Sequence, residues 1–578
     1  MSKGQIESKI ATSVLVIGSG GAGLRAAIEL SERGIDVLVV GKRNKTDAHT
    51  SLAAGGINAA LATMDKEDSW QQHMADTILE SYFLSNPITA EIVTKNAARG
   101  IDDLERWGMP FARESDGRIS QRYFGAHKYR RTAFAGDFTG LEIQRTLISR
   151  ATQLNIPIID NLYITKLLVS DNVVFGAYGF EIANGRRVTI LADAVIIAAG
   201  GHTRIWRRSS SRRDENNGDS FKLAVDAGCR LRDVELVQFH PSGIIEPENV
   251  AGTLISEAAR GEGGYLLNSL GERFMERYDP KRMELSTRDR VALAAYTEIK
   301  EGRGTPKGGV LLDISHLPRE VIMTRLPRIY QTMLELQVLD VTTTPIEIAP
   351  TAHYSMGGVW VNSEDHSTDV KGLYAIGEAS SGLHGANRLG GNSLIELLVY
   401  GRIVGEAAAE YSAGLEYHRR SREAISLAGL EVSDMLSSNG YENVRALQRD
   451  LRNIMTDHCG VVRDEKGLLE GLNKINDLEE RQKRIGVQTN ISGFGGLAYA
   501  FDLSASLLAG RATIESALER KESRGAHNRS DYPVLDPKLQ VNLIWSRDNT
   551  ITHESIPPIP EEISELISSV SHEGKLLE

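Results

Sequence analysis

The chain has 578 residues, 41% of them hydrophobic and 25% charged, which is typical of globular enzymes, and its length calls for several domains rather than one core. Its net charge of −11 disfavours nucleic acid as a partner, and we find no apolar run long enough to cross a bilayer and no secretory signal pattern. The only cysteines, Cys229 and Cys459, are too few to hold an iron–sulfur cluster or a structural zinc ion, so no metal site is predicted, and they favour a reducing compartment.

The N-terminal segment carries the pattern of a nucleotide-binding fold. An apolar run at 14–17 predicts a strand, apolar positions 24, 27, 28 and 30 predict a helix, and "IDVLVV" predicts a second strand. Gly18, Gly20 and Gly23 follow the spacing G-x-G-x-x-G between the first strand and the helix. Such glycines let a pyrophosphate approach the helix N-terminus, so the segment predicts a βαβ unit of a Rossmann-like α/β domain.

The second predicted strand lacks the acidic residue that usually binds the adenine ribose. Gly41 and Lys42 occupy its place, which disfavours a nicotinamide dinucleotide and leaves a flavin open, because a loop backbone can make that contact. The next loop, "HTSLAAGGINAAL", combines small residues with the imidazole of His49. Small residues suit close packing on a flat polar group, but the imidazole needs its own explanation.

Strands far along the chain extend the same domain. "ADAVIIAAGG" and "GLYAIGEASSG" are each typical of a buried strand that ends in small residues, and Gly218 and Asp219 mark a helix start between them. We therefore expect a nucleotide-binding domain that is split by an inserted α+β capping domain. The predicted division is 1–235 plus 345–415 for the nucleotide-binding domain, 236–344 for the capping domain, 416–535 for a helical domain and 536–578 for a C-terminal surface segment.

Two apolar stripes at helical spacing predict the helical domain. Val444, Leu447, Leu451 and Ile454 form the first stripe. The second stripe consists of Leu468, Leu472, Ile475 and Leu478. We interpret both as the core faces of a helical bundle.

Polar residues gather on segments in the middle of the chain. A lone His or Arg is more often structural than functional, but these segments carry several. They are His240 and Ser242 in "VQFHPSG", Ser256, Glu257, Arg260 and Glu262 in "LISEAARGEGG", Arg288, Asp289 and Arg290 in "ELSTRDRVA", His353 in "PTAHYSMGGV", and His384 and Arg388 in "GLHGANRLGGNSL". Such a set, in a protein that binds a flavin, suits an anionic substrate with two carboxylates.

Together these segments resemble the flavoprotein subunit of succinate dehydrogenase and fumarate reductase. The resemblance runs from Val14 to about Pro533 and includes "RGEGGYLLNSLGERFMERY", "HYSMGGV", "LHGANRLGGNSL" and "ESRGAHNRSDYP". The wider superfamily also contains L-aspartate oxidase, which shares the fold and much of the pocket. The resemblance implies an FAD-dependent oxidoreductase that interconverts succinate and fumarate.

The resemblance also assigns roles to matching positions. Those implied for FAD are Gly18, Gly20, Gly21, Gly23, Lys42, His49, Thr50, Gly55, Gly56, Asp219, Glu378, Asn392, Ser393 and Leu394. Those implied for the dicarboxylate are His240, Ser256, His353 and Arg388. Arg288 matches the family's catalytic arginine, which exchanges a proton with the substrate carbon, and Glu257 and Asp289 are the expected relay to water.

The expected reaction explains why a base is needed. Oxidation of succinate sends a hydride to the flavin and requires the protein to take a proton from the neighbouring carbon. Arginine is a poor base in water and becomes suitable only where burial and other cations disfavour its charge and a carboxylate takes the proton onward. His353, Arg388 and Glu257 suit that setting and equally suit positioning of a carboxylate, so both interpretations stay open.

In the family, a histidine just before the small-residue loop is covalently attached to the flavin 8α-methyl group, and His49 matches that place. Covalent attachment makes the flavin more oxidising, as oxidation of succinate demands, whereas L-aspartate oxidase has a small or hydroxyl-bearing residue there and holds FAD noncovalently. His49 therefore favours the dehydrogenase/reductase over a loop histidine that only hydrogen-bonds FAD. Against this, "SEAARGEGG" is closer to the oxidase, and Ala54 stands where Gln or Glu normally precedes the glycine pair.

The resemblance further implies partners. Electrons are expected to pass to an iron–sulfur subunit, and from it to quinone, with the chain cytoplasmic and held at the inner face of the membrane by anchor subunits. Two alternatives remain. One is L-aspartate oxidase, which converts L-aspartate to iminoaspartate for NAD biosynthesis; the other is a noncatalytic flavin-binding or assembly protein, which the charged pocket disfavours.

Overall fold

A seven-stranded sheet forms the centre of the molecule, in the order β6-β2-β1-β9-β8-β7 with β16 paired to β9. The computed structural model describes residues 7–417, 419–489 and 493–572. The strands of this sheet are β1 (Glu7–Ile17), β2 (Val37–Val40), β6 (Ile158–Ile159), β7 (Leu162–Ser170), β8 (Val173–Glu181), β9 (Arg187–Ile197) and β16 (Leu373–Ala375). β1 runs parallel to β2 and β9, whereas β7, β8 and β9 pair antiparallel.

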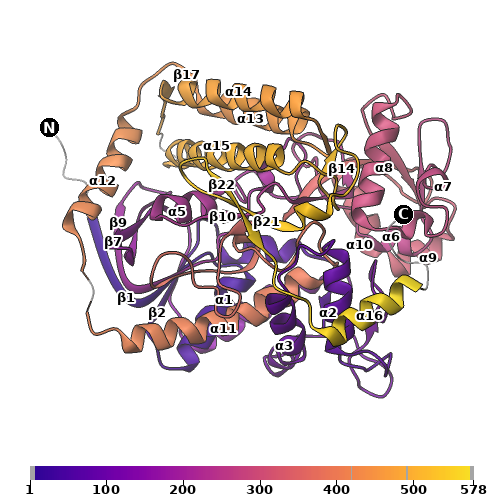
Figure 1. Cartoon of the computed structure of the whole chain (residues 1–578), viewed down its shortest axis with the longest axis horizontal. Coiled ribbons are helices and arrows are strands. Elements are labelled where there is room, and N and C mark those ends of the chain that lie inside the picture. The colour runs from indigo at the N-terminus through magenta and orange to yellow at the C-terminus, as the bar shows by residue number, and fades with distance from the viewer. Residues whose placement is uncertain (1–6, 418, 490–492, 573–578) are drawn as a thin grey trace.

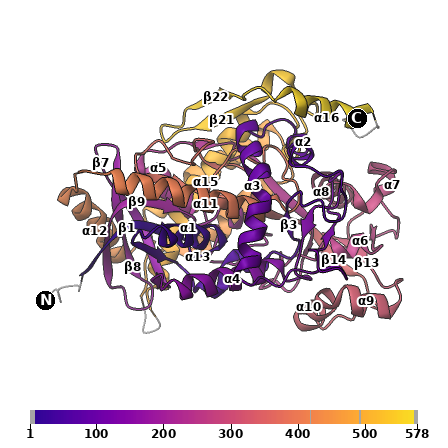
Figure 2. The same ribbon diagram turned by 90° about the horizontal axis from the view of Figure 1, so that it is seen from below.

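Continuous apolar sequence explains why the parallel part of this sheet lies inside the protein. Val14, Leu15 and Val16 are fully buried, as expected for strands covered on both faces. Helix α1 (Gly21–Glu32) follows β1 and packs against α11 (Asn392–Gly414), as Figure 2 shows. The predicted βαβ unit and the late return of the chain to the same sheet are confirmed.

Short elements build a wall beside this unit. A small sheet has the order β3-β5-β4, with β3 (Ile57–Asn58), β5 (Thr132–Ala133) and β4 (Gln121–Arg122). The helices of this region are α2 (Trp70–Glu80), α3 (Pro87–Arg106) and α4 (Thr139–Gln153). Since α4 also packs against α1, the wall is fixed to the nucleotide-binding unit.

A separate sheet in the order β11-β14-β13-β12 carries the middle of the chain, at the right of Figure 1. Its strands are β11 (Val237–Ile244), β12 (Tyr265–Leu267), β13 (Val310–Asp313) and β14 (Ile346–Ser355). Its helices are α6 (Ala258–Gly261), α7 (Met275–Tyr278), α8 (Arg288–Lys300), α9 (Arg319–Arg325) and α10 (Pro327–Gln337). β14 lies beyond 344 in sequence but completes this sheet, so the capping sheet includes a strand that the predicted division places in the returning segment.

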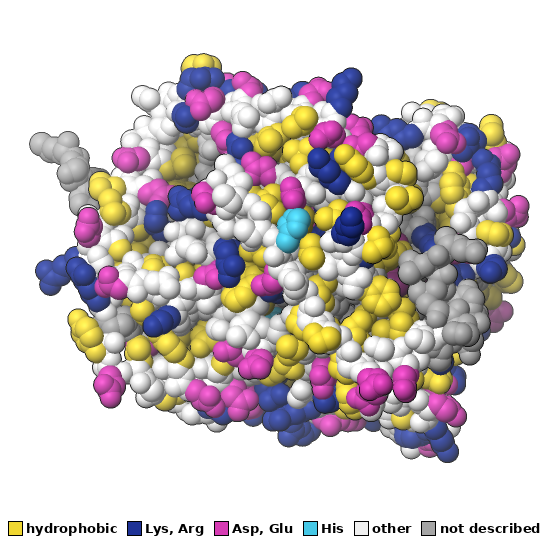
Figure 3. Space-filling model, viewed as in Figure 1, with side chains coloured by type: hydrophobic (Ala, Val, Ile, Leu, Met, Phe, Trp, Pro, Cys, Tyr) yellow, Lys and Arg dark blue, Asp and Glu magenta, His cyan; other side chains and the backbone are white. Residues whose placement is uncertain are grey.

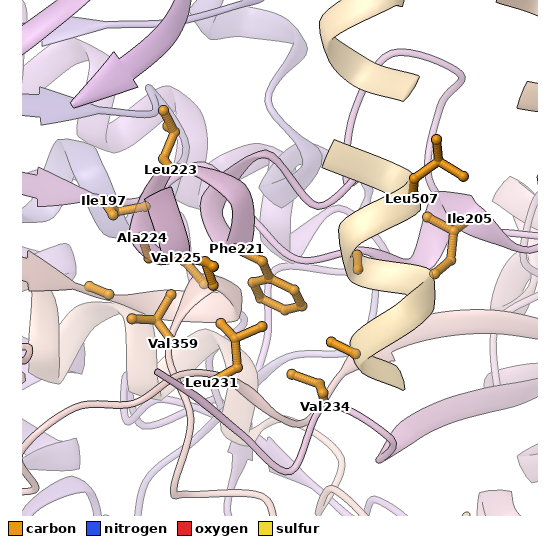
Figure 4. Packing of buried hydrophobic residues seen from close by; sticks show 14 of the residues in the cluster. Ile197, Ile205, Phe221, Leu223, Ala224, Val225, Leu231, Val234, Val359 and Leu507 are labelled. Carbon is orange, nitrogen blue, oxygen red and sulfur yellow. The ribbon is translucent and has the colours of Figure 1, made fainter. Parts of the chain in front are cut away.

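The helical part contains α12 (Arg422–Ser437), α13 (Val444–His458), α14 (Glu465–Gln482) and α15 (Gly495–Glu519). Both predicted apolar stripes face its interior; only Leu472 is partly exposed among their residues. These helices share a core with the central sheet. Figure 4 shows Phe221 of α5 (Asp219–Ala227) with Ile197 of β9 on one side and Leu507 of α15 on the other.

The C-terminal segment predicted to lie on the surface is only partly exposed. Its strands β21 (Val541–Trp545) and β22 (Ile551–Ser555) join a sheet in the order β15-β10-β21-β22, with β10 (Leu231–Arg232) and β15 (Gly358–Val359). Trp545 is 2% exposed, and Ile563 of α16 (Glu561–His572) is fully buried in the cluster that contains α2 residues. Short parallel pairs β17 (Glu442–Asn443) with β19 (Ile485–Gly486), and β18 (Val462–Arg463) with β20 (Asn528–Arg529), fasten the neighbouring loops.

The surface mixes charges of both signs. On the face in Figure 3, acidic and basic side chains are interspersed among apolar ones. Within the described part of the chain, none of the helices is both long and apolar enough to span a bilayer. The same residues contain no group of His, Cys, Asp and Glu placed to hold a metal ion, and Cys229 and Cys459 are buried thiols.

The shared core yields a stability prediction. Leu451→Ala should lower the free energy of unfolding by about 2–5 kcal/mol, because Leu451 is 1% exposed and its truncation leaves a cavity. Leu469→Ala is the matched control on α14, where Leu469 is 47% exposed and the change should stay within about 0.5 kcal/mol. Denaturant unfolding followed by circular dichroism measures both; equal losses would contradict the packing.

Candidate active site

A cavity of about 560 Å³ lies between the nucleotide-binding unit and the capping sheet. Its lining includes the glycine turn before α1 and also His240, Arg288 and Arg388, a group that we call the substrate end. One cavity thus contains both the predicted cofactor positions and the predicted substrate positions. The cavity contains groups from both parts of the fold, so the site depends on how they pack together.

The glycine turn opens this cavity to a phosphate. Gly18 has φ +120°, and a Cβ there would lie 2.1 Å from the carbonyl oxygen of Ala198. A Cβ on Gly23 would lie 1.9 Å from the oxygen of Gly18, so Gly23 allows the close approach of α1 and does not itself line the cavity. The first turn of α1 has no acidic residue, and the amide of Gly21 donates to Thr50 Oγ1 at 3.0 Å. The N-terminus of α1 therefore presents the partial positive charge that suits a pyrophosphate.

Lys42 stands at the end of β2 and bridges two carboxylates. Its Nζ lies 2.8 Å from Asp219 Oδ2 and 2.7 Å from Asp502 Oδ1, and the hydroxyl of Tyr163 donates to Asp502 at 2.9 Å. Burial opposes the charge on Lys42, but the two carboxylates outweigh it and raise its pKa. Burial and the neighbouring Asp219 raise the pKa of Asp502 to about 7. Asp502 comes from α15, so the helical part of the chain contacts Lys42, which lines the cavity.

His49 begins a 3-10 turn (His49–Leu52) on the cavity wall. Its Nδ1 lies 3.0 Å from Oε1 of Glu215, a buried carboxylate. Burial opposes protonation of the imidazole, but Glu215 raises its pKa. Gly55 and Gly56 close the same loop; a Cβ on Gly55 would meet the ring of Phe124 at 2.7 Å. The loop is thus packed tightly while its histidine is held by an ionic partner.

A second helix N-terminus faces the cavity. Gly391, Ser393 and Leu394 at the start of α11 line it. The side chain of Asn392 does not, because its amide and carbonyl are engaged with Asn58, Thr77 and His73 inside the wall. The contact of Asn392 with FAD stays a prediction, and its side chain is already engaged within the wall. Glu378 also lines the cavity and accepts from the amide of Ser355 at 3.0 Å.

Two histidines and an arginine face one another at the substrate end. Arg388 Nη2 lies 3.3 Å from His353 Nε2 and 3.0 Å from Gln238 Oε1, and the rings of His240 and His353 are 5.5 Å apart between centroids. Burial and nearby guanidinium groups hold the pKa values of both histidines well below the usual range. Burial and the charge of Arg288 lower the pKa of Arg388 to about 10. The result is a neutral-imidazole, cationic-guanidinium pocket that suits a carboxylate. Ser256 lies on its wall.

Arg288 is the first residue of α8 and forms an ion pair with Glu257, Nε to Oε2 at 3.1 Å. Arg260, with a fully buried side chain, lies 3.7 Å from the same oxygen. Burial favours protonation of Glu257, but the two arginines outweigh it and lower its pKa. Arg260 itself has a lowered pKa, owing to burial and the charge of Arg288. Arg288, Glu257 and Arg260 thus form a continuous chain of charged groups.

Asp289 does not join that chain. Its carboxylate accepts from the hydroxyl of Tyr82 at 2.7 Å and from the amide of Asn387 at 3.0 Å. Consecutive residues of a helix point in different directions, so Asp289 lies on a different side of α8 from Arg288, and the residue that approaches Glu257 is Arg260, at 3.7 Å. Arg260 belongs to one of the polar segments seen in the sequence, but only the fold shows its distance to Glu257.

The cavity fits FAD in shape and in chemistry. Open glycine backbone, a helix N-terminus without an acidic residue, and a wall of small residues are present where a dinucleotide with a flat ring system needs them. Most of the residues predicted for FAD line it: Gly18, Gly20, Gly21, Lys42, His49, Thr50, Gly55, Gly56, Asp219, Glu378, Ser393 and Leu394. His240, Ser256, His353, Arg388, Arg288 and Glu257 line it as well.

Comparison with known proteins agrees with this geometry. A family model described as "FAD binding domain" matches residues 13–394, and "Fumarate reductase flavoprotein C-term" matches residues 448–558. A subunit of the fumarate reductase (CoM/CoB) of Methanothermobacter marburgensis is 42% identical, covering 92% of this chain and 97% of that protein. The succinate dehydrogenase flavoprotein subunit of Rickettsia bellii is 38% identical, covering 91% of each. A solved structure of E. coli quinol fumarate reductase superposes with a TM-score of 0.89 at 32% identity, covering 96% and 99%. FAD is therefore the cofactor.

The Lys42 bridge gives a prediction for cofactor binding. Lys42→Met leaves the buried carboxylate of Asp502 and the partly buried one of Asp219 without their cation, which should cost about 3–5 kcal/mol and weaken FAD retention. Lys42→Met combined with Asp502→Asn should recover part of that loss, because one of the facing charges is gone. FAD content after gel filtration and thermal unfolding measure both variants; no recovery in the double variant would contradict the bridge.

Proposed function

The chain belongs to the family of flavoprotein subunits of succinate dehydrogenase and fumarate reductase, and we propose that it interconverts succinate and fumarate as an FAD-dependent oxidoreductase. One observation carries the proposal. The Arg288–Glu257 ion pair lies in the same cavity as His240, His353 and Arg388 and as the glycine turn for FAD. Its relatives are named both dehydrogenases and reductases, and the proposal covers both directions.

The residues at the substrate end bind and orient a dicarboxylate. Arg388 donates to one carboxylate and also to Nε2 of the neutral His353, whose own proton lies on Nδ1 beside Ser210 Oγ, so His353 orients this guanidinium. The neutral His240 supplies a further N–H group. The amide of Ser242 donates to His240 Nδ1 at 3.2 Å, which leaves the proton on Nε2 and makes that nitrogen the donor. Since the cavity lies between two parts of the fold, the capping sheet also excludes water from the bound substrate.

Arg288 takes the role of proton donor and acceptor. When bound, FAD accepts the hydride of succinate oxidation or returns it to fumarate. Arg288 then exchanges the proton at the neighbouring carbon, and Glu257 and Arg260 carry that proton onward through contacts of 3.1 and 3.7 Å. The ionised Glu257 makes this exchange feasible, because its carboxylate is available to take the proton from Arg288 in an otherwise cationic site.

The electrons of the reaction must pass between the flavin and a partner protein. The proposal therefore includes an iron–sulfur subunit that receives or supplies them, quinone as the final partner, and anchor subunits that hold the chain at the inner face of the membrane. The E. coli relative is a quinol fumarate reductase, which supports this arrangement. His49 is proposed as the covalent attachment point for the flavin, since its ring lies on the cavity wall beside the glycine loop.

Substrate choice separates this function from that of an L-aspartate oxidase. One purified, FAD-loaded preparation should reduce an electron-accepting dye with succinate and not with L-aspartate, and should oxidise a reduced viologen dye with fumarate. The cationic cavity explains the expectation, because the ammonium group of aspartate is repelled there. Turnover with L-aspartate at a rate comparable to that with succinate would overturn the proposal.

The proton route makes a separate prediction. Arg288→Lys should lower kcat in both directions by about 10²–10⁴-fold, because the Nε contact with Glu257 is lost, while FAD stays bound. Arg290→Lys is the matched control, since Arg290 lies on the same helix with a side chain 39% exposed and does not line the cavity. Steady-state rates with fumarate, together with the flavin absorbance, report both effects. Near-normal turnover in Arg288→Lys would remove the arginine from the route.

A further inference from the structure

Glu215 is a carboxylate in the active site. It belongs neither to the G-x-G-x-x-G motif nor to the residues whose roles the family resemblance implies. It precedes the helix-starting Gly218 by three residues, lies on the cavity wall and is 8% exposed. Its Oε1 accepts from the amide of Arg212 at 2.7 Å and lies 3.0 Å from His49 Nδ1. The carboxylate is therefore fixed by the backbone and pointed at the imidazole.

This contact decides which ring nitrogen of His49 is available. A carboxylate can only accept, so Nδ1 carries the proton and donates to Glu215. Nε2 makes no hydrogen bond within the described residues, on a side chain that faces the cofactor cavity. An imidazole held at Nδ1 by a carboxylate presents a more basic Nε2, as in sites where a buried acid orients a histidine.

Among the charged groups around His49, Glu215 is its direct partner. Arg212 Nη1 lies 3.6 Å from the other oxygen of Glu215, and Glu378 is engaged by the amide of Ser355 and by Asn216. Burial favours protonation of Glu215, but His49 and Arg212 outweigh it and lower its pKa to about 2. The carboxylate is thus ionised whenever the protein is folded at neutral pH.

We propose that Glu215 positions and activates His49 for its covalent bond to the flavin. The inference rests on the covalent attachment included in the proposed function. In this step the Nε2 lone pair of His49 forms a bond to the 8α-carbon, a C–H bond of that methyl group breaks, and its proton leaves to solvent. The electron pair of the broken bond reduces the flavin ring, and fumarate, the substrate of the enzyme itself, takes the pair up again. Because Nδ1 keeps its proton, the linked imidazole becomes cationic, and Glu215 neutralises that charge.

The test follows flavin attachment rather than turnover. The apoprotein is mixed with FAD and fumarate, denatured at intervals, and analysed for protein-bound flavin fluorescence and for the mass of the His49 peptide. Glu215→Gln should bind FAD noncovalently and attach it at least ten times more slowly than the unaltered protein. His49→Ser should show no attachment, and Asp214→Asn is the matched control, because Asp214 pairs with Arg43 and should leave the rate unchanged.

Each outcome decides the inference. Attachment at the original rate in Glu215→Gln overturns it and leaves the succinate–fumarate function intact. If Glu215→Gln does not fold, Glu215→Asp retains the charge but draws it back from Nδ1, and an unchanged rate in that variant overturns the inference. An unaltered protein that turns over succinate with only noncovalent FAD removes the covalent link, and this inference with it, but not the reaction.

Discussion

The active site concentrates positive charge on arginine side chains that folding largely buries, and the rest of the site depends on that constraint. Arg260, Arg288 and Arg388 come from separate segments, yet Glu257 is the carboxylate that contacts two of them. Burial and mutual repulsion lower the pKa values of Arg260 and Arg388. A substrate with two carboxylates relieves this repulsion. The positive electrostatic potential of the folded site therefore stabilises a bound dianion.

Strand register sets the geometry of the substrate end. His240 on β11 pairs opposite Thr351 on β14, and His353 follows two residues later on the same strand. The ladder shifts register between Gln238 and Phe239, so His353 is the extra residue of a bulge and has no partner opposite it on β11. With this bulge, the rings of His240 and His353 lie 5.5 Å apart between centroids. The capping sheet therefore does more than cover the site, because its pairing and its bulge position the two imidazoles.

The sequence predicted the parts of the site that are local. The glycine turn, the apolar stripes and the polar segments each depend on neighbours within a few residues; the turn lines the cavity, the stripes are mostly buried, and each polar segment contributes at least one residue to the cavity wall. The contacts of His49 with Glu215 and of Lys42 with Asp502 join residues 166 and 460 positions apart, so no local pattern reveals them. Asn392 and Asp289 show a second limit of prediction from sequence. A motif identifies a position in the chain, but it does not tell in which direction the side chain points.

Ala54 stands where the family pattern has Gln or Glu, and a neighbouring strand holds the backbone of its loop. Arg122 of β4 stacks on Phe134 at 4.4 Å and donates to the carbonyl oxygens of Ala54 and Gly55, so a neighbouring strand braces the loop backbone. Neither Ala54 nor Phe124, which lies against Arg288 at 5.4 Å, offers a side-chain acceptor to the cavity.

The side chains of Ala54 and Phe124 also bear on substrate choice. The carboxylate of Glu257 is already engaged by arginines, so an ammonium group that approaches it meets positive charge. Succinate and fumarate carry the two carboxylates without the amine. We therefore expect the charges near Ala54 to disfavour L-aspartate by repulsion, even though the carboxylate-binding groups would serve either substrate.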